Sequence, residues 1–316
     1  MTEVSVVVPT YNRMDVLPEV LQALEQQVDA PEFEVIVVDD GSDDGTWDWL
    51  CTFRKTTTLP ALTIHRQENT GPAAARNWGV KAAQGDRVAF LGDDTVPSEG
   101  WLARHQAAAK AHAEHGDVAV IGYTAWHSRM RLNPFLRYIN EHGLQFGYAL
   151  IDDPHDVPFN FLYTSNLSLP RRCLLTEPFD LGFPYAAWED IELSYRLKAK
   201  DLRLVYEASA TVAHDHPTDL TRFMSRQEKA GYSAVVFYQL HPELGGFLGL
   251  GPQGPPPVPS RRRQALKVAL ARCLHYVPMS TPRLWESILR FHYIRGLHRG
   301  WDERVQPPET RSGTAS

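Results

Sequence analysis

The stretch Val88-Ala89-Phe90-Leu91-Gly92-Asp93-Asp94-Thr95-Val96-Pro97 is a short apolar run that stops at two adjacent carboxylates. Its apolar residues, bounded by glycines, suit a strand that is buried on both faces. Ligands of open α/β sheets gather at the carboxyl ends of strands, so we expect Asp93 and Asp94 where a ligand arrives. Oxygen ligands on a loop suit Mg²⁺ or Mn²⁺. Taken alone, the stretch also fits a solvated turn, because turns favour Asp, Gly and Pro.

Composition describes an ordinary globular protein. The 316 residues are 43% hydrophobic, which is enough to bury a substantial core. The net charge of −6 argues against a broad nucleic-acid-binding surface, so no nucleic-acid partner is expected, although a nucleotide ligand remains open. Cys51, Cys173 and Cys273 are too scattered for a disulfide framework, which favours a reducing, cytoplasmic compartment. No apolar stretch has the length of a spanning helix, so any membrane contact is expected to be peripheral.

Working outward from the acidic stretch, strands and helices alternate along the N-terminal half. The apolar run Val4–Val8 ends in Pro9-Thr10-Tyr11-Asn12, and Phe33–Val38 ends in Asp39-Asp40-Gly41-Ser42. A helix with one buried stripe lies between them, which predicts a mostly parallel sheet. The first strand is not followed by the glycine-rich turn of a dinucleotide-binding unit, so a Rossmann dehydrogenase is disfavoured.

Further charged groups stand at predicted helix starts. Pro72 occupies a first helical position, so Arg76 lies within two turns of that helix's N-terminus, where it can pair with a phosphate or with an acidic neighbour. Glu189 and Asp190 open a later helix, where they can also simply complement the helix dipole. His214-Asp215-His216 follows a short strand and can supply a metal ligand or ordinary hydrogen-bonded histidines.

The C-terminal part changes in composition. We predict a catalytic domain over residues 1–244, a Gly/Pro-rich linker over 245–260, a helical extension over 261–302 and a disordered tail over 303–316. Residues 125–158 are interrupted by prolines and are expected to form a long excursion that shapes a substrate pocket.

The ordered set of motifs carries a resemblance. The set is Pro9-Thr10-Tyr11-Asn12, Val37-Val38-Asp39-Asp40-Gly41-Ser42, Gly71-Pro72-Ala73-Ala74-Ala75-Arg76-Asn77, Gly92-Asp93-Asp94, Trp188-Glu189-Asp190 and His214. In this order, over roughly residues 3 to 220, it resembles a family 2 glycosyltransferase. The resemblance implies the GT-A fold, a Rossmann-like α/β domain with a mostly parallel central sheet flanked by helices, here followed by a C-terminal helical extension. It also implies transfer of a sugar from a nucleoside diphosphate donor with inversion at the anomeric carbon.

The resemblance also implies roles for individual residues. Asp190 matches the family's general base, and Asp94 and His214 match its ligands for Mn²⁺ or Mg²⁺. The nucleotide would be bound by Pro9, Thr10, Tyr11, Asp39, Asp40, Arg76 and Asp93, and the acceptor side would include Trp188 and Glu189. Many relatives carry a third acidic residue where this chain has Gly92, which concerns the geometry of the metal site.

The chemistry independently requires two such sites. An inverting displacement needs a base opposite the leaving group, and the departing diphosphate needs its charge neutralised. Two rivals remain: a nucleotidyltransferase of similar fold, which would usually carry a glycine-rich basic loop after the first strand, and a non-catalytic nucleotide-sugar-binding protein.

The acceptor is expected to be a saccharide, a lipid-linked molecule or another hydroxyl compound. Basic residues beside Leu266, Val268, Leu270 and Leu274 suggest that the segment from Arg261 to Trp301 lies on a membrane surface or covers an acceptor site. The alternatives are a helical pair packed on the catalytic domain or a homodimer contact.

Overall fold

The computed structural model describes residues 2–274 and 282–305. The chain divides into two compact units. Unit 1 comprises Met1–Arg131, Ile139–Leu181 and Glu189–Pro217, and unit 2 comprises Leu132–Tyr138, Gly182–Trp188 and the chain from Thr218 onward. In this division, two segments from well before the predicted boundary at residue 244 belong to unit 2 together with the C-terminal part of the chain: Leu132–Tyr138 and Gly182–Trp188. Within the described part of the chain, no helix has the length and apolar character needed to cross a membrane.

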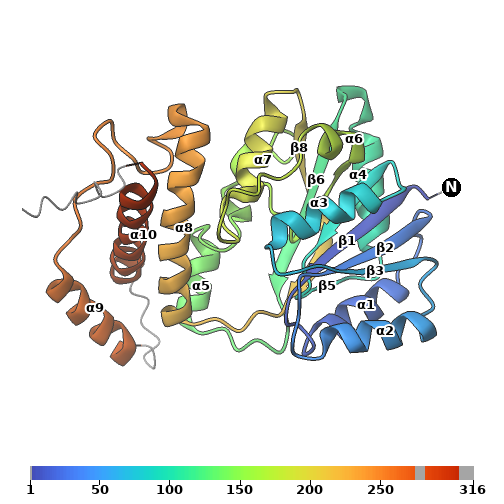
Figure 1. The fold of residues 1–316 in the computed structure, drawn as a ribbon, viewed down its shortest axis with the longest axis horizontal. Helices are drawn as coiled ribbons and strands as arrows, with labels where there is room; N and C mark the ends of the chain where they lie inside the picture. Colours follow the sequence, from blue (N-terminus) through green and yellow to red (C-terminus); the bar gives the residue numbers. More distant parts are fainter. Residues whose placement is uncertain (1, 275–281, 306–316) are drawn as a thin grey trace, which may run out of the picture. The chain divides into compact units, whose positions relative to one another are not determined.

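Unit 1 contains one eight-stranded sheet, in the order β3-β2-β1-β4-β7-β6-β8-β5 (Figure 1). Four strand pairs are parallel and three are antiparallel, the latter involving β7 and β5. The strands are β1 (Val4–Thr10), β2 (Phe33–Asp39), β3 (Leu62–Arg66), β4 (Arg87–Leu91), β5 (Thr95–Pro97), β6 (Val118–Trp126), β7 (Asn166–Pro170) and β8 (Arg203–His214). The predicted α/β fold with a mostly parallel sheet is therefore confirmed.

Helices cover both faces of the sheet, as the apolar strands require. Alternate residues of β1 point to opposite sides: Val7 packs in one core cluster with α3, whereas Val6 and Val8 pack in another with α1 and α2. Figure 1 shows α3 on one side of β1–β3 and α1 and α2 on the other. The helices of unit 1 are α1 (Leu17–Glu25), α2 (Thr46–Thr56), α3 (Pro72–Ala82), α4 (Trp101–Ala111), α6 (Arg171–Thr176) and α7 (Glu189–Lys198), with short 3₁₀ turns η1 (Ala113–His115), η2 (Tyr148–Leu150) and η3 (Phe159–Phe161).

Strand direction brings the candidate site residues to one edge. Strands β1, β2 and β4 are parallel neighbours, so their carboxyl ends at Thr10, Asp39 and Leu91 lie side by side. Strand β7 is antiparallel to both β4 and β6, so its beginning lies at this edge and β6 runs in the same direction as β4. Strand β8 is parallel to β6, which brings its end at His214 to the same edge.

Unit 2 is helical and consists mainly of α8 (Leu220–Leu240), α9 (Arg261–Leu274) and α10 (Pro282–Arg304), with the short turn η4 (Pro242–Leu244). Helices α8 and α10 approach closely because glycines face the partner helix. A Cβ atom added at Gly231 would lie 2.0 Å from the carbonyl oxygen of Tyr293, and one at Gly296 would lie 2.0 Å from that of Glu228. The predicted C-terminal helices are present.

Several elements differ from the sequence-based expectations. The excursion expected at 125–158 contains a helix, α5 (Pro134–Glu141). The short strand expected before His214 is a strand of 12 residues, β8, with a register irregularity opposite Gly122/Tyr123. Helix α8 was not predicted. Helix α10 continues through Arg304, past the predicted end of the helical extension, and the rest of the predicted tail, 306–316, lies outside the described residues.

Candidate active site

The acidic turn follows β4 directly. The backbone N–H of Gly92 donates to the carbonyl of Ser165 at 3.1 Å, and the N–H of Thr95 donates to Gly92 O at 3.1 Å. A Cβ atom at Gly92 would lie 3.2 Å from Asp94 Oδ1, so a side chain there would crowd the carboxylate. These bonds hold Asp93 and Asp94 at the edge of the sheet.

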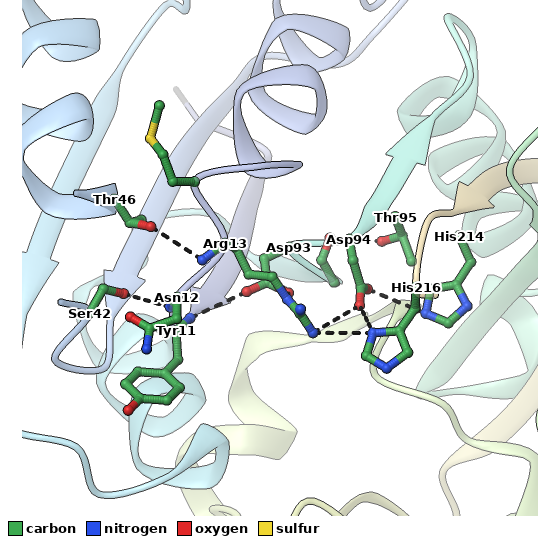
Figure 2. Close-up of polar contacts among 12 residues, drawn as sticks. Tyr11, Asn12, Arg13, Ser42, Thr46, Asp93, Asp94, Thr95, His214 and His216 are labelled. Carbon is green, nitrogen blue, oxygen red and sulfur yellow. Dashed lines mark hydrogen bonds and ion pairs between the residues drawn. The ribbon is translucent and has the colours of Figure 1, made fainter. Parts of the chain in front are cut away.

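Asp94 faces two histidines that come from the end of β8. Asp94 Oδ1 lies 3.5 Å from His214 Nε2, and Asp94 Oδ2 lies 3.0 Å from His216 Nδ1 (Figure 2). One ligand atom from each of the three side chains lies within 4.8 Å of the others. The sequence-based pair of Asp94 and His214 is thus brought together, and His216 is added to it. A carboxylate with two imidazoles is a donor set for a divalent transition metal ion.

Arg13 places a positive charge against this cluster. Its Nη2 lies 3.2 Å from His216 Nδ1 and 3.4 Å from Asp94 Oδ2, and its Nε lies 3.5 Å from Asp93 Oδ1 (Figure 2). When the guanidinium donates to Nδ1, that nitrogen is an acceptor beside a second acceptor, the carboxylate oxygen. The Arg13 guanidinium supplies a cation beside this pair. In addition, His214 Nδ1 is buried without a hydrogen-bond partner in the described part of the chain. These residues fit a bound metal ion.

The two neighbouring carboxyls differ in acidity. Burial, together with the charge of Asp94, raises the pKa of Asp93 to about 7. Burial would also raise the pKa of Asp94, but hydrogen bonds from His214 and His216 and the charges of these rings outweigh it, and the pKa of Asp94 is lowered. Asp94 is the one of the two carboxyls that faces both histidines.

Five of the residues predicted to bind the nucleotide lie at the ends of β1 and β2, but they differ in how accessible they are to a ligand: Pro9, Thr10, Tyr11, Asp39 and Asp40. Asp39 is fully buried, and its Oδ2 faces Arg66 Nε at 3.3 Å. Both oxygens of Asp40 accept hydrogen bonds, at 2.8 to 2.9 Å, from the segment that leads into α3. Asp40 therefore holds that loop, whereas Tyr11 is 47% exposed and available to a ligand.

The loop after β1 is itself tied to the acidic turn. The backbone N–H of Tyr11 donates to Asp93 Oδ2 at 3.3 Å, and that of Asn12 donates to the hydroxyl of Ser42 at 2.8 Å (Figure 2). Asn12 has a positive φ of 52°, a conformation that asparagine tolerates better than most residues. Pro9 and Thr10, the other two residues predicted here, close β1 and pair in register with Val38 and Asp39.

The sequence left two partners open for Arg76, a phosphate and an acidic neighbour. In the structure Arg76 pairs with an acidic neighbour, Glu189. Its Nη1 donates to Glu189 Oε1 at 2.8 Å, and its guanidinium lies over the ring of Phe179. Arg76 Nε and Glu189 Oε2 are both buried without a hydrogen-bond partner in the described part of the chain. That Arg76 also faces the nucleotide or its phosphates stays a prediction.

Asp190 follows Glu189 at the start of α7. Burial, together with the charge of Glu189, raises the pKa of Asp190 to about 7, although Arg76 and the backbone N–H groups of Ile191 and Thr164 counteract this shift. A carboxyl group with this acidity can accept a proton near neutral pH. Trp188, which belongs to unit 2, has a positive φ of 75° and donates from Nε1 to the carbonyl of Ala230 at 3.0 Å.

One short segment of unit 1 lies beside both acidic sites. The backbone N–H of Thr164 lies close enough to the carboxylate of Asp190 to favour the ionised form of that group. The next residue, Ser165, accepts hydrogen bonds at its carbonyl oxygen from Gly92 N at 3.1 Å and from the hydroxyl of Thr95 at 3.2 Å. Because consecutive Cα atoms are about 3.8 Å apart, this segment keeps Asp190 near the acidic turn.

Two residues of the site were not among the predicted site residues. Arg13 follows the Pro9–Asn12 motif directly, and a cation beside a strand end could have suggested an anionic ligand. His216 stands two residues after His214, and the alternation of side chains along an extended chain places both rings on one face. Their rings stack with centroids 5.5 Å apart.

Known proteins resemble this chain in sequence and in fold. Residues 5–167 match the family model described as glycosyl transferase family 2. The chain is 30% identical over 248 residues to the pre-mycofactocin glycosyltransferase of Mycobacterium tuberculosis, covering 76% of this chain and 48% of that protein. It is 36% identical over 261 residues to the uncharacterized glycosyltransferase YfnE of Bacillus subtilis, covering 68% of this chain and 65% of that protein. The chain thus spans about half to two thirds of the length of these relatives.

Among solved structures, the mannosyltransferase PcManGT from Pyrobaculum calidifontis, in complex with GDP-Man and Mn²⁺, aligns with a TM-score of 0.64 at 19% identity. The alignment covers 96% of this chain and 88% of that one. At this identity the likeness concerns the fold. Because the family model spans more than half of the chain and the sheet carries the expected acidic groups at its carboxyl edge, this chain belongs to glycosyltransferase family 2.

Proposed function

We propose that this chain transfers a sugar from a nucleoside diphosphate sugar to an acceptor hydroxyl, with inversion at the anomeric carbon and with help from a divalent metal ion. The observation that carries the proposal is the Thr164-Ser165 segment. It lies beside the general-base candidate Asp190 at Thr164, and it accepts hydrogen bonds from the Gly92–Thr95 turn at Ser165. An inverting transfer needs both a base and an anion-stabilising site within the reach of one sugar.

Asp190 takes the proton of the acceptor hydroxyl. The hydroxyl oxygen forms the new bond to the anomeric carbon, and the electron pair of the broken bond goes to the departing diphosphate oxygen. Arg13 supplies positive charge on the diphosphate side, because its guanidinium already lies against Asp93 and Asp94. Arg76 holds Glu189 and so keeps Asp190 oriented at the start of α7.

Asp94, His214 and His216 would hold the metal ion, which supplies charge neutralisation for the diphosphate. Two imidazoles favour Mn²⁺ over Mg²⁺, since Mg²⁺ prefers oxygen ligands and retains water. The neighbour PcManGT, which is described with GDP-Man and Mn²⁺, supports the same choice. The nucleotide would lie over Thr10, Tyr11 and Asp39, with Asp93 on the ribose.

The rival functions have less support. A nucleotidyltransferase usually carries a glycine-rich basic loop after the first strand, and this chain has Pro9-Thr10-Tyr11-Asn12 there. A non-catalytic binding protein has no need for a carboxyl group such as Asp190, whose pKa burial raises to about 7.

The test is a thermal-shift screen of UDP, GDP and their sugars with and without Mn²⁺, followed by a transfer or donor-hydrolysis assay with the ligand that binds. A ligand that binds only the native state raises the melting temperature. Stabilisation by one nucleotide that depends on Mn²⁺, together with turnover, is expected. Binding without any turnover of the corresponding sugar donor would favour the non-catalytic alternative.

We propose in addition that α9 contacts an anionic membrane surface. Its exposed face carries Leu266 and Leu270, which are 73% and 51% exposed, beside the exposed Arg262 and Arg263, and the helix contains no acidic residue. The test is sedimentation with phosphatidylglycerol vesicles and with phosphatidylcholine vesicles. Leu266→Asp should reduce binding to the anionic vesicles, whereas Leu181→Asp, at another exposed leucine, should not. Equal loss in both variants would remove the proposal.

A further inference from the structure

The residue between the two histidines turns away from the metal-ligand cluster. In the segment His214-Asp215-His216, the two rings face Asp94, whereas Asp215 accepts a hydrogen bond at Oδ2 from Arg129 Nε at 2.6 Å. The Asp215 side chain is only 8% exposed. This segment is therefore held from both sides, by Asp94 on one and by Arg129 on the other.

Arg129 is in turn anchored to α1. Its Nη2 donates to Glu19 Oε2 at 2.5 Å, and the same carboxylate lies 3.3 Å from His127 Nε2 through its other oxygen. Arg129 Nε and Nη2 thus connect two carboxylates, Asp215 and Glu19, from different parts of unit 1. A planar guanidinium suits such a double connection because its donors point in fixed directions.

The main chain alone does not fix this segment fully. Asp215 N donates to the carbonyl of Asp94 at 2.8 Å, and His127 N donates to that of His214 at 2.9 Å. Beyond these bonds the strand has ended, and the His216 side chain is 41% exposed. Without Arg129, the buried carboxylate of Asp215 would lack its counter-charge and would gain free energy by turning toward water. Such a rotation would carry the neighbouring imidazoles away from Asp94.

We propose that Arg129 is a positioning residue for the metal site: by holding Asp215, it directs His214 and His216 toward Asp94. This inference rests on the proposed function, because it requires that the three side chains bind a metal ion. It adds an outer residue, from the segment after β6, whose charge never contacts the metal or the substrate. Removing outer partners of metal ligands typically weakens metal affinity by about 10- to 100-fold.

The experiment measures Mn²⁺ binding to the full chain by electron paramagnetic resonance of the free ion, for the wild type and for Arg129→Ala, Arg129→Lys and Arg172→Ala. Arg172 pairs with Asp117 on the same unit, away from the histidines, and is the matched control. We expect Arg129→Ala to bind Mn²⁺ about 10- to 100-fold more weakly. Arg129→Lys should recover part of the affinity, since it keeps the charge but not the fork, and Arg172→Ala should equal the wild type.

A spectroscopic measurement distinguishes a positioning role of Arg129 at the metal site from a purely structural role. Electron spin echo modulation of bound Mn²⁺ at saturating metal should show imidazole nitrogen coupling in the wild type and a loss of that coupling in Arg129→Ala. Unchanged affinity and unchanged coupling in Arg129→Ala would overturn the inference while leaving the metal site intact. Absence of saturable Mn²⁺ binding by the wild type would instead overturn the metal site itself, and the inference with it.

Discussion

Arg76 Nη1 donates to Glu189 Oε1 at 2.8 Å, joining α3 to the first residue of α7. Both side chains are largely buried, at 12% and 5% exposed. Removing one partner of a buried pair leaves an uncompensated charge and costs about 3 to 5 kcal/mol. The pair lies beside Asp190, and the charge of Arg76 favours the ionised form of that carboxyl. A contact that looks purely structural therefore acts on the proposed general base.

Arg76→Gln should move the acid limb of the kcat/KM profile to higher pH. Burial and Glu189 raise the pKa of Asp190, and Arg76 opposes them, so the loss of its charge raises that pKa further above about 7. Arg76→Lys keeps the charge and should shift the limb less. The double variant Arg76→Gln with Glu189→Gln removes both charges and should return the acid limb of the kcat/KM profile toward its wild-type position. A higher donor KM at an unchanged midpoint would instead point to a role in nucleotide binding.

The wild-type enzyme should lose activity in mildly acidic solution. The base acts only when ionised, and burial raises its pKa to about 7. Hence kcat/KM should be level above this pH and should fall about tenfold per pH unit below it.

Asp190→Asn should lower kcat by about 10²- to 10⁴-fold while nucleotide binding with Mn²⁺ is retained. Near-wild-type transfer by this variant would exclude Asp190 as the base.

The sequence could predict the strands and the carboxylates at their ends, because these features depend on local patterns. Buried runs such as Val88–Leu91 and the Asp93-Asp94 turn after them are visible within ten residues. What could not be predicted are contacts between distant residues: Arg13 meets Asp94 across 81 positions, and His216 meets it across 122. Local position also left Arg76 with two partners, and only the folded arrangement of α3 and α7 selects Glu189.

Helix α8 was missed for a different reason. Its segment begins Leu220-Thr-Arg-Phe and includes Gly231, a residue that lowers helix propensity by about 1 kcal/mol relative to Ala. Its helical state is supported by packing against α10, where that glycine permits close approach. The contact between α8 and α10 therefore compensates for a local preference against the helix. Sequence periodicity cannot predict such a contact between distant segments.

His216→Ala should weaken Mn²⁺ binding although His216 was not predicted as a ligand. Its Nδ1 lies 3.0 Å from Asp94 Oδ2, so it completes the cluster with His214. We expect a loss of metal affinity in calorimetry that approaches the loss in Asp94→Asn. His155→Ala, at an exposed histidine of the same unit, is the control and should bind as the wild type does. Equal affinity in His216→Ala and wild type would leave Asp94 and His214 as the only protein ligands of this cluster.

Gly296→Ala should destabilise unit 2, although helix propensity alone predicts the opposite. Alanine in a helix interior is favoured over glycine by about 1 kcal/mol. At Gly296, however, the added Cβ would lie 2.0 Å from the carbonyl oxygen of Glu228 and 2.9 Å from Tyr232 N, both backbone atoms of α8 that cannot rotate away. Forcing packed helices apart typically costs about 1 to 3 kcal/mol or more, so the clash outweighs the propensity gain.

Gly246→Ala is the matched control, because a Cβ there meets no atom within 4 Å and its backbone conformation does not require glycine. Urea unfolding followed by circular dichroism, together with limited proteolysis of the segment after Pro217, reports the difference. We expect Gly296→Ala to unfold at lower urea concentration and to be cleaved faster in α8 and α10 than Gly246→Ala. If Gly296→Ala proved as stable as the control or more stable, the gain in helix propensity would outweigh any clash. The two helices would then not be in backbone contact at this point.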